Sequence, residues 1–203
     1  MKRIVFGLLL SAVWSVSQAS ALVINNASPV SFKGYDGEPQ RVTGAESKGS
    51  WGSLGATKAG ILSVTYLGSE SAYVDRFSFG FGKGSLLESN RLGTTISESV
   101  GAGLLKFSFL DSKGVTFSNG QKQGKTLGFA ILNGQTNMYG TFDYLLGFND
   151  SYCGDADYDD FVVGVRFTGV DAPVPEPRTY AMLVAGLGLL GLSIRRRKEG
   201  VFD

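Results

Sequence analysis

Apolar residues alternate with polar or small residues in five separate windows of the chain. Successive side chains of a β-strand point to opposite faces, so this period of two places the apolar positions of each window on one face. We find no long run with the helical spacing of apolar positions. The windows are Leu62, Val64 and Tyr66; Phe77, Phe79 and Phe81; Leu105, Phe107 and Phe109; Leu127, Phe129 and Ile131; and Phe161, Val163, Val165 and Phe167. Each window predicts a strand that offers one apolar face to a shared core.

Turn-forming residues separate these windows, and glycine is abundant throughout the region. The pair Asn133-Gly134 lies between two strand windows and indicates a hairpin. Many short antiparallel strands joined by such turns are typical of an all-β fold, an antiparallel β-sandwich or jelly roll. We therefore predict that residues 22–172 form one β-sandwich domain, with the phenylalanines in its core.

The N-terminal segment has the three parts of a secretory signal peptide. Lys2 and Arg3 supply the positive charge, an apolar run follows from Ile4 to Val16, and Ala19-Ser20-Ala21 is a small-residue cleavage pattern. The apolar run is short for a membrane anchor. Residues 1–21 are thus predicted to be removed during export, with the mature chain beginning at Leu22.

The C-terminal segment, residues 173–203, combines a linker with a single hydrophobic helix. An extended proline-containing stretch leads to the apolar residues 179–194, and basic residues 195–198 follow. Sixteen helical residues cover about 24 Å, so we expect a marginal transmembrane helix. The basic cluster favours the cytoplasmic side, which leaves the preceding domain outside.

Pro175, Glu176 and Pro177 precede the apolar run, and Arg195, Arg196 and Arg197 follow it. With these residues in this order, the tail resembles the PEP-CTERM sorting signal of Gram-negative bacteria. The resemblance implies recognition and processing by exosortase, a membrane enzyme, and an association with exopolysaccharide. It also implies a precursor anchored in the inner membrane with its domain in the periplasm, and a later position at the outer surface or in the extracellular matrix.

Charge and composition remove several function classes. Between Leu22 and Pro177 there are 12 basic and 16 acidic residues, so the body is mildly acidic and nucleic acid is not an expected partner. The chain has no histidine, which excludes Ser-His-Asp and Cys-His catalysis. Its single cysteine, Cys153, cannot form an intramolecular disulfide and is expected to be an inert loop residue, although pairing between chains stays open.

Acidic residues concentrate between Phe148 and Phe161. The candidate metal ligands are Asp150, Asp155, Asp157, Asp159 and Asp160. Five carboxylates so close together repel one another unless they are solvated, protonated or shared with a cation. Oxygen ligands without histidine suit a hard cation, Ca²⁺ before Mg²⁺. An EF-hand fits poorly, because its sixth position would be Asp160 and its twelfth Arg166.

The same loop resembles the closing segment of secreted bacterial β-sandwich domains of unknown function. Its pattern here is Gly154-Asp155-Ala156-Asp157-Tyr158-Asp159, followed by an apolar strand. The resemblance implies a structural cation site and no catalytic residue. Two alternatives stay open: the aspartates form a solvated turn, or two carboxylates, including Glu70 or Glu88, act as a glycosidase acid/base pair.

Two functions are compatible with these features. The first is a non-enzymatic exported surface or matrix protein stabilised by Ca²⁺ at the acidic loop. The second is a carbohydrate-binding, lectin-like module that acts on exopolysaccharide, with Trp51, Tyr35 and Tyr139 as candidate stacking residues. Exposure of these aromatic side chains would favour the second function, and their burial would favour the first.

Overall fold

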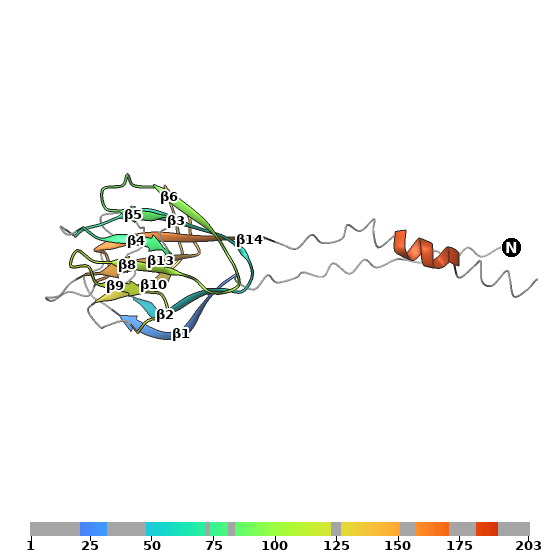
Figure 1. Ribbon diagram of the computed structural model, residues 1–203, viewed down its shortest axis with the longest axis horizontal. Helices are drawn as coiled ribbons and strands as arrows, with labels where there is room; N and C mark the ends of the chain where they lie inside the picture. Colours follow the sequence, from blue (N-terminus) through green and yellow to red (C-terminus); the bar gives the residue numbers. More distant parts are fainter. Residues whose placement is uncertain are drawn as a thin grey trace, which may run out of the picture. The chain divides into compact units, whose positions relative to one another are not determined.

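The computed structural model describes residues 21–31, 48–71, 74–80, 84–122, 127–150, 157–170 and 182–190. Contacts group the chain into two units, Met1–Gly169 and Val170–Asp203. The first unit contains all the strands, and the described part of the second contains one helix, over residues 182–190 (Figure 1). The predicted signal peptide before residue 21 lies outside the described residues.

The strands form two main antiparallel sheets and one small hairpin. The large sheet has the order β1-β2-β10-β13-β14-β3-β6, with β7 paired to β2, and the second sheet has the order β5-β4-β8-β9. The hairpin pairs β11 with β12. The strands are β1 (Leu22–Ser31), β2 (Lys48–Ala56), β3 (Gly60–Gly68), β4 (Arg76–Phe79), β5 (Ser85–Leu87), β6 (Thr95–Val100), β7 (Gly103–Leu104), β8 (Phe107–Leu110), β9 (Thr116–Ser118), β10 (Gly128–Asn133), β11 (Thr136–Asn137), β12 (Gly140–Thr141), β13 (Tyr144–Asn149) and β14 (Phe161–Gly169).

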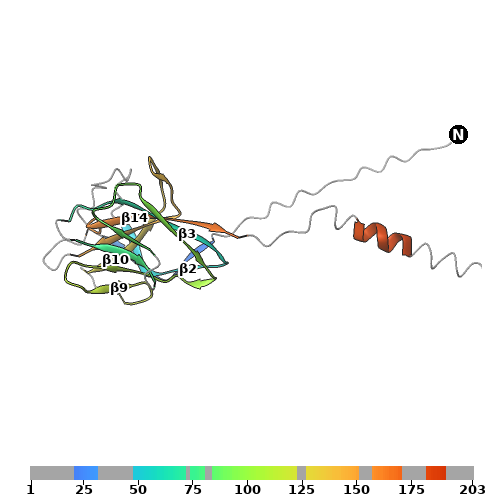
Figure 2. The same cartoon turned by 45° about the horizontal axis from the view of Figure 1, so that its top comes forward.

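The two main sheets share one hydrophobic core, which confirms the predicted all-β, antiparallel fold with a sandwich-like arrangement (Figure 2). Phe109 of β8 is fully buried and stacks on Phe148 of β13, with ring centroids 4.9 Å apart and an interplanar angle of 3°. The centroid of its ring also lies 5.5 Å from that of Phe129 and 6.2 Å from that of Phe161. The phenylalanines of the second sheet thus pack directly on the central strands of the large sheet.

The central strands of the large sheet are buried on both faces, which the alternating pattern did not predict. Five consecutive residues of β10, and five of β13, are buried. A second apolar cluster covers their outer face; its buried members are Val30, Leu67, Ala130, Leu132, Phe142, Leu145, Tyr158 and Val162. Phe142 and Tyr158 reach this face from connections between strands, which the period of two within a strand cannot predict. Phe142 lies over Gly164, where an added Cβ would meet its ring at 2.5 Å.

The hairpin expected at Asn133-Gly134 differs in its loop. β10 does pair with β13, with Asn133 opposite Tyr144, so the two strands form an antiparallel pair. The connection is longer than two residues, however, and contains β11 and β12. Gly134 packs against the backbone carbonyls of Phe142 and Asp143, where a Cβ would clash. The glycine therefore serves a close backbone approach rather than a tight two-residue turn.

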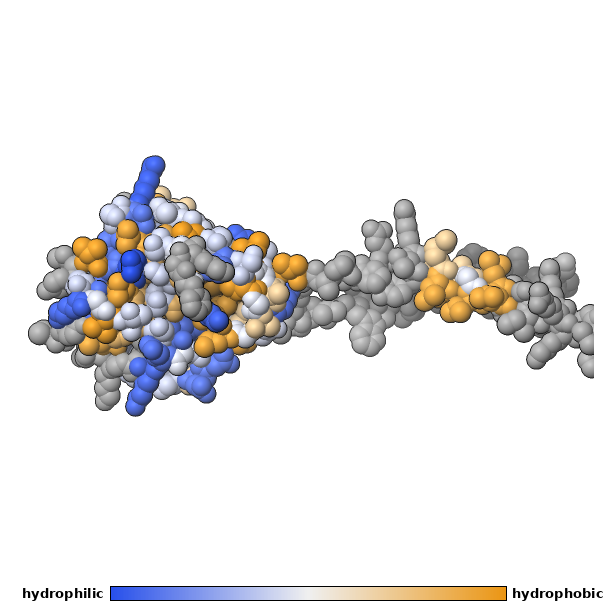
Figure 3. Space-filling view, viewed as in Figure 1, coloured by the Kyte–Doolittle hydropathy of each residue, from blue (hydrophilic) through white to orange (hydrophobic). Residues whose placement is uncertain are grey.

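The described helix over residues 182–190 is apolar, as its colour in Figure 3 shows. Within the described residues, no helix is long and apolar enough to cross a membrane. The predicted transmembrane helix over 179–194 is therefore not confirmed, and its two ends lie outside the described residues. The sorting-motif residues Pro175 to Pro177 and the arginines at 195–197 also lie outside them.

We expect Phe109→Ala to lower the free energy of unfolding by about 3–5 kcal/mol, because it removes a fully buried ring that joins the two sheets. Phe117→Ala is the matched control. Phe117 is only partly buried at the margin of the same core, so its loss should cost clearly less. Denaturant unfolding of both variants checks this, and equal costs would contradict the central position of Phe109.

Candidate metal centre

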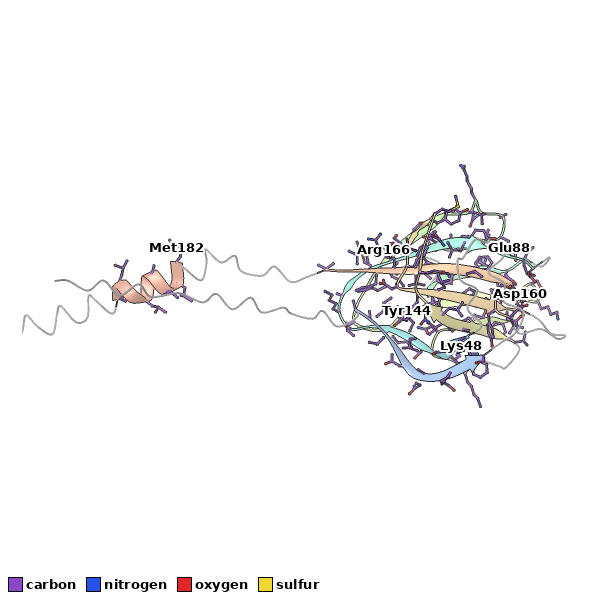
Figure 4. The ribbon with its side chains drawn as sticks, turned by 180° about the vertical axis from the view of Figure 1, so that it is seen from behind. Lys48, Glu88, Tyr144, Asp160, Arg166 and Met182 are labelled. Atoms are coloured by element: carbon purple, nitrogen blue, oxygen red, sulfur yellow. The ribbon has the colours of Figure 1, made fainter. Side chains whose placement is uncertain are left out.

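Seven carboxylates gather at the end of the sandwich where β14 begins. In the large sheet β13 pairs with β14 through Phe148 and Phe161, and β14 pairs with β3 through Val162 and Gly68. The end of β13, the start of β14 and the end of β3 therefore meet. Figure 4 shows the labelled Glu88 and Asp160 at this same end. The residues are Glu70, Asp75, Glu88, Asp150, Asp157, Asp159 and Asp160.

Three of these carboxylates form a first group, which we call the outer acidic group: Glu70, Asp157 and Asp159. One carboxylate oxygen from each lies within 4.8 Å of the others. Asp159 is 1% exposed, and its two oxygens are buried without a hydrogen-bond partner among the described residues. The backbone N–H of Glu70 donates to the carbonyl oxygen of Asp159 over 3.3 Å, which holds the two segments together.

Tyr158 fixes the backbone between the two aspartates of the outer acidic group. Its φ of 64° lies in the left-handed region, which is uncommon for a residue with a side chain. Its ring is fully buried in the cluster on the outer face of the large sheet, and its hydroxyl accepts a hydrogen bond of 2.9 Å from Trp51 Nε1. Its backbone carbonyl packs on Gly147, where a Cβ would clash. These contacts position Asp157 and Asp159.

The other four carboxylates form a second group, the inner acidic group: Asp75, Glu88, Asp150 and Asp160. Asp160 Oδ2 accepts a 2.7 Å hydrogen bond from the backbone N–H of Asp150. Glu88 Oε1 accepts from Ser69 Oγ over 2.8 Å. Asp75 is 0% exposed, and neither of its oxygens has a hydrogen-bond partner within the part of the chain that the structure describes.

Burial and mutual repulsion raise the pKa values of carboxyls in both groups. Burial, then repulsion by Asp150 and Glu88, raises the pKa of Asp75 to about 8. Burial, then the neighbouring Asp157, raises the pKa of Asp159 to about 9, and burial raises that of Asp160 to about 7. No Lys or Arg of the described chain is among the causes of these shifts. The carboxylates need a proton or a cation to stay together.

The predicted ligands divide between the two groups. Asp157 and Asp159 belong to the outer acidic group, and Asp150 and Asp160 to the inner one. Asp155 and Cys153 lie outside the described residues. The sequence reasoning considered Glu70 and Glu88 only as acid/base candidates and missed Asp75. Glu70 and Asp75 lie in the link between two predicted strands, so the sequence does mark them as loop carboxylates. Their proximity to the acidic loop could be found only from the pairing of β14 with β3.

The aromatic stacking candidates are not freely exposed. Trp51 and Tyr139 are half-buried and pack against the cluster on the outer face of the large sheet. Trp51 also lines a hollow of about 470 Å³, together with Asn26, Ser28 and Gln121. Tyr35 lies outside the described residues.

Residues 173–198 match the family model of the PEP-CTERM protein-sorting motif. This match confirms the resemblance found in the tail. The motif marks an exported, membrane-anchored precursor that is recognised and processed by exosortase, a membrane enzyme. No curated protein and no solved structure matched the chain. The comparisons thus identify the tail as a sorting signal and leave the strand domain to be interpreted from its own residues.

Without divalent cations, the strand domain should lose stability as the pH rises from about 5 to about 9. The carboxyls of Asp75, Asp159 and Asp160 have raised pKa values in the native state, so the native state binds more protons than the unfolded state. This contribution is complete below about pH 4 and disappears as the pH passes through the folded values. Thermal melts in chelator check the trend. A melting temperature that rises over this range would contradict it.

Proposed function

We propose that this protein is a non-enzymatic surface or extracellular-matrix protein whose strand domain is stabilised by Ca²⁺. Asp157, Asp159 and Glu70 would hold the ion. The precursor would stand in the inner membrane with its domain in the periplasm, and exosortase processing would release it to the outer surface or the matrix. The tail supports the export route, and the outer acidic group supports the calcium site.

The observation that best supports the calcium site is the burial of the Asp159 carboxylate without a hydrogen-bond donor. Its side chain is 1% exposed, and both of its oxygens lack a hydrogen-bond partner among the described residues. An ionised carboxylate has only acceptors, so Asp157 can bond to it only through a shared proton. A buried charge is normally paired or bound to a metal. Among the described residues the converging ligands are three carboxylates, and such an oxygen-only set suits Ca²⁺ better than a transition metal.

The aromatic residues favour this structural role over the carbohydrate-binding one. The indole N–H of Trp51 donates to the Tyr158 hydroxyl, and its ring packs on the apolar cluster there. A stacking platform for sugar rings needs an exposed aromatic face, whereas Trp51 and Tyr139 each use part of their rings to cover the sheet. Trp51 instead links that cluster to the residue between the two aspartates.

Calcium should raise the melting temperature of the protein at neutral pH. A ligand that binds only the native state stabilises it by about 3 kcal/mol at a hundredfold excess over its Kd. Asp159→Asn should remove most of the difference between melts in calcium and in chelator, because it removes the most buried charge of the outer acidic group. Glu98→Gln on β6 changes a carboxylate outside both groups and should keep the full response. Identical wild-type melts in calcium and chelator would eliminate the proposed ion.

Processing should be visible in the mass of the exported protein. In a host with exosortase, we expect the mature chain to begin at Leu22 and to lose the tail near residues 175–178, since the sorting motif covers 173–198. Glu176→Ala should leave an unprocessed form in the membrane fraction, whereas Glu199→Ala, outside the motif, should be processed normally. Intact-mass measurement of the exported protein distinguishes the processed form from the unprocessed form. A wild-type mass that still includes the C-terminal residues would argue against processing.

A further inference from the structure

We propose that Trp51 is a positioning residue for the calcium ion at the outer acidic group, and that it acts through its hydrogen bond to Tyr158. By the same coupling, the ion would fix the position of the Trp51 ring. This inference rests on the proposed calcium site. It adds a residue that carries no carboxylate and lies in β2, 107 positions before Tyr158 in the sequence.

The hydrogen bond between Trp51 and Tyr158 joins two distant strands of the large sheet. Tyr158 belongs to the segment just before β14, and β10 and β13 lie between β2 and β14 in the sheet order. The indole Nε1–H donates to the Tyr158 hydroxyl over 2.9 Å. The Tyr158 ring is fully buried in one cluster with Ala130, Leu132 and Leu145 of β10 and β13. Burial strengthens a hydrogen bond, so this one can hold the Tyr158 side chain firmly.

Tyr158 carries this constraint to the ligands, because Asp157 and Asp159 are its two neighbours in the chain. In an extended strand, residues two positions apart are about 6.6 Å apart along the chain. Here the chain turns through the left-handed φ of 64° at Tyr158, and the two aspartates and Glu70 have carboxylate oxygens within 4.8 Å of one another. A left-handed backbone is unfavourable for a residue with a side chain and persists only where surrounding contacts hold it.

Two contacts of Tyr158 hold that backbone. Its carbonyl packs on Gly147 of β13, and its side chain is fixed by burial and by the hydrogen bond from Trp51. The first contact acts directly on the backbone, and the second acts at the far end of the ring. Loss of the hydrogen bond would therefore loosen the turn and let the carboxylates of Asp157 and Asp159 move apart.

The surroundings of Trp51 allow its ring to respond to the ion. The half-buried ring packs against the cluster on the outer face of the large sheet, and it also lines the hollow of about 470 Å³. The register of β1 shifts between Asn25 and Ser28, next to the position where Ser28 pairs with Trp51. The ring thus has open space into which it can turn when the Tyr158 hydroxyl moves away.

The size of the expected effect follows from linkage between the two sites. Without a cation, repulsion among the three carboxylates opposes the turn at Tyr158, and a bound ion removes that repulsion. The factor by which the hydrogen bond strengthens ion binding must equal the factor by which the ion strengthens the hydrogen bond. One hydrogen bond changes an equilibrium by about three- to tenfold.

Isothermal titration of the full chain with CaCl₂, in mild detergent at neutral pH after chelator treatment, tests the proposal. Trp51→Phe and Tyr158→Phe should each weaken the calcium Kd by about three- to tenfold. The double variant should bind no more weakly than either single variant, because both changes remove the same hydrogen bond. Tyr139→Phe is the matched control, since Tyr139 is half-buried against the same cluster, and it should keep the wild-type Kd.

Fluorescence of Trp51 gives the reciprocal measurement. The sequence has two tryptophans, and Trp14→Phe in the predicted signal peptide leaves Trp51 as the single emitter. In this background calcium should shift the emission to shorter wavelength and reduce quenching by acrylamide. Asp159→Asn should abolish the calcium-dependent change, and Tyr158→Phe should remove most of it.

The outcomes separate failure of this inference from failure of the proposed function. If Trp51→Phe and Tyr158→Phe melt at a lower temperature in chelator but keep the wild-type calcium Kd, Trp51 serves only the packing of the sheet. The inference is then wrong and the calcium site stands. If the wild type binds no calcium, both fail. Should Trp51→Phe not fold, as judged by circular dichroism, Tyr158→Phe decides, because it keeps the buried ring and removes only the hydroxyl.

Discussion

Repulsion among buried carboxylates is the constraint on which the acidic end of this sandwich depends. Asp75 and Asp159 are almost completely shielded from water, and neither has a hydrogen-bond donor in the described chain. Like charges in such surroundings favour protonation or a cation, which explains the raised pKa values of both groups. The proposed calcium ion would relieve this repulsion at Glu70, Asp157 and Asp159.

The packing of the large sheet makes this arrangement possible. The stacked rings of Phe109 and Phe148 hold the second sheet against the central strands, so the ends of β4 and β13 stay close. On the outer face, the buried ring of Tyr158 and its hydrogen bond to Trp51 anchor the acidic segment to the same strands. Gly147 leaves room for the Tyr158 carbonyl. Apolar burial therefore positions the carboxylates, and their charge opposes the burial unless a cation is present.

The proposed calcium site also suits an exported protein with one cysteine. With one cysteine in the sequence, an intramolecular disulfide cannot cross-link the strands. A cation that binds only the native state stabilises it by an amount that grows with the logarithm of its concentration above the Kd. The sorting motif at residues 173–198 directs the precursor to exosortase, whereas the proposed ion would act on the folded domain.

The sequence by itself determined the sorting tail, the all-β class and the identity of most acidic residues at the site. These are local properties: the Pro-Glu-Pro motif is contiguous, and a period of two follows from the backbone of a strand. The tertiary structure decided which carboxylates meet. Asp75, Glu70 and Glu88 are distant from the loop in sequence and join it only through the pairing of β14 with β3 and the packing of two sheets. It also decided that β10 and β13 are buried on both faces, because Phe142 and Tyr158 arrive from connections whose path the alternation of apolar residues does not encode.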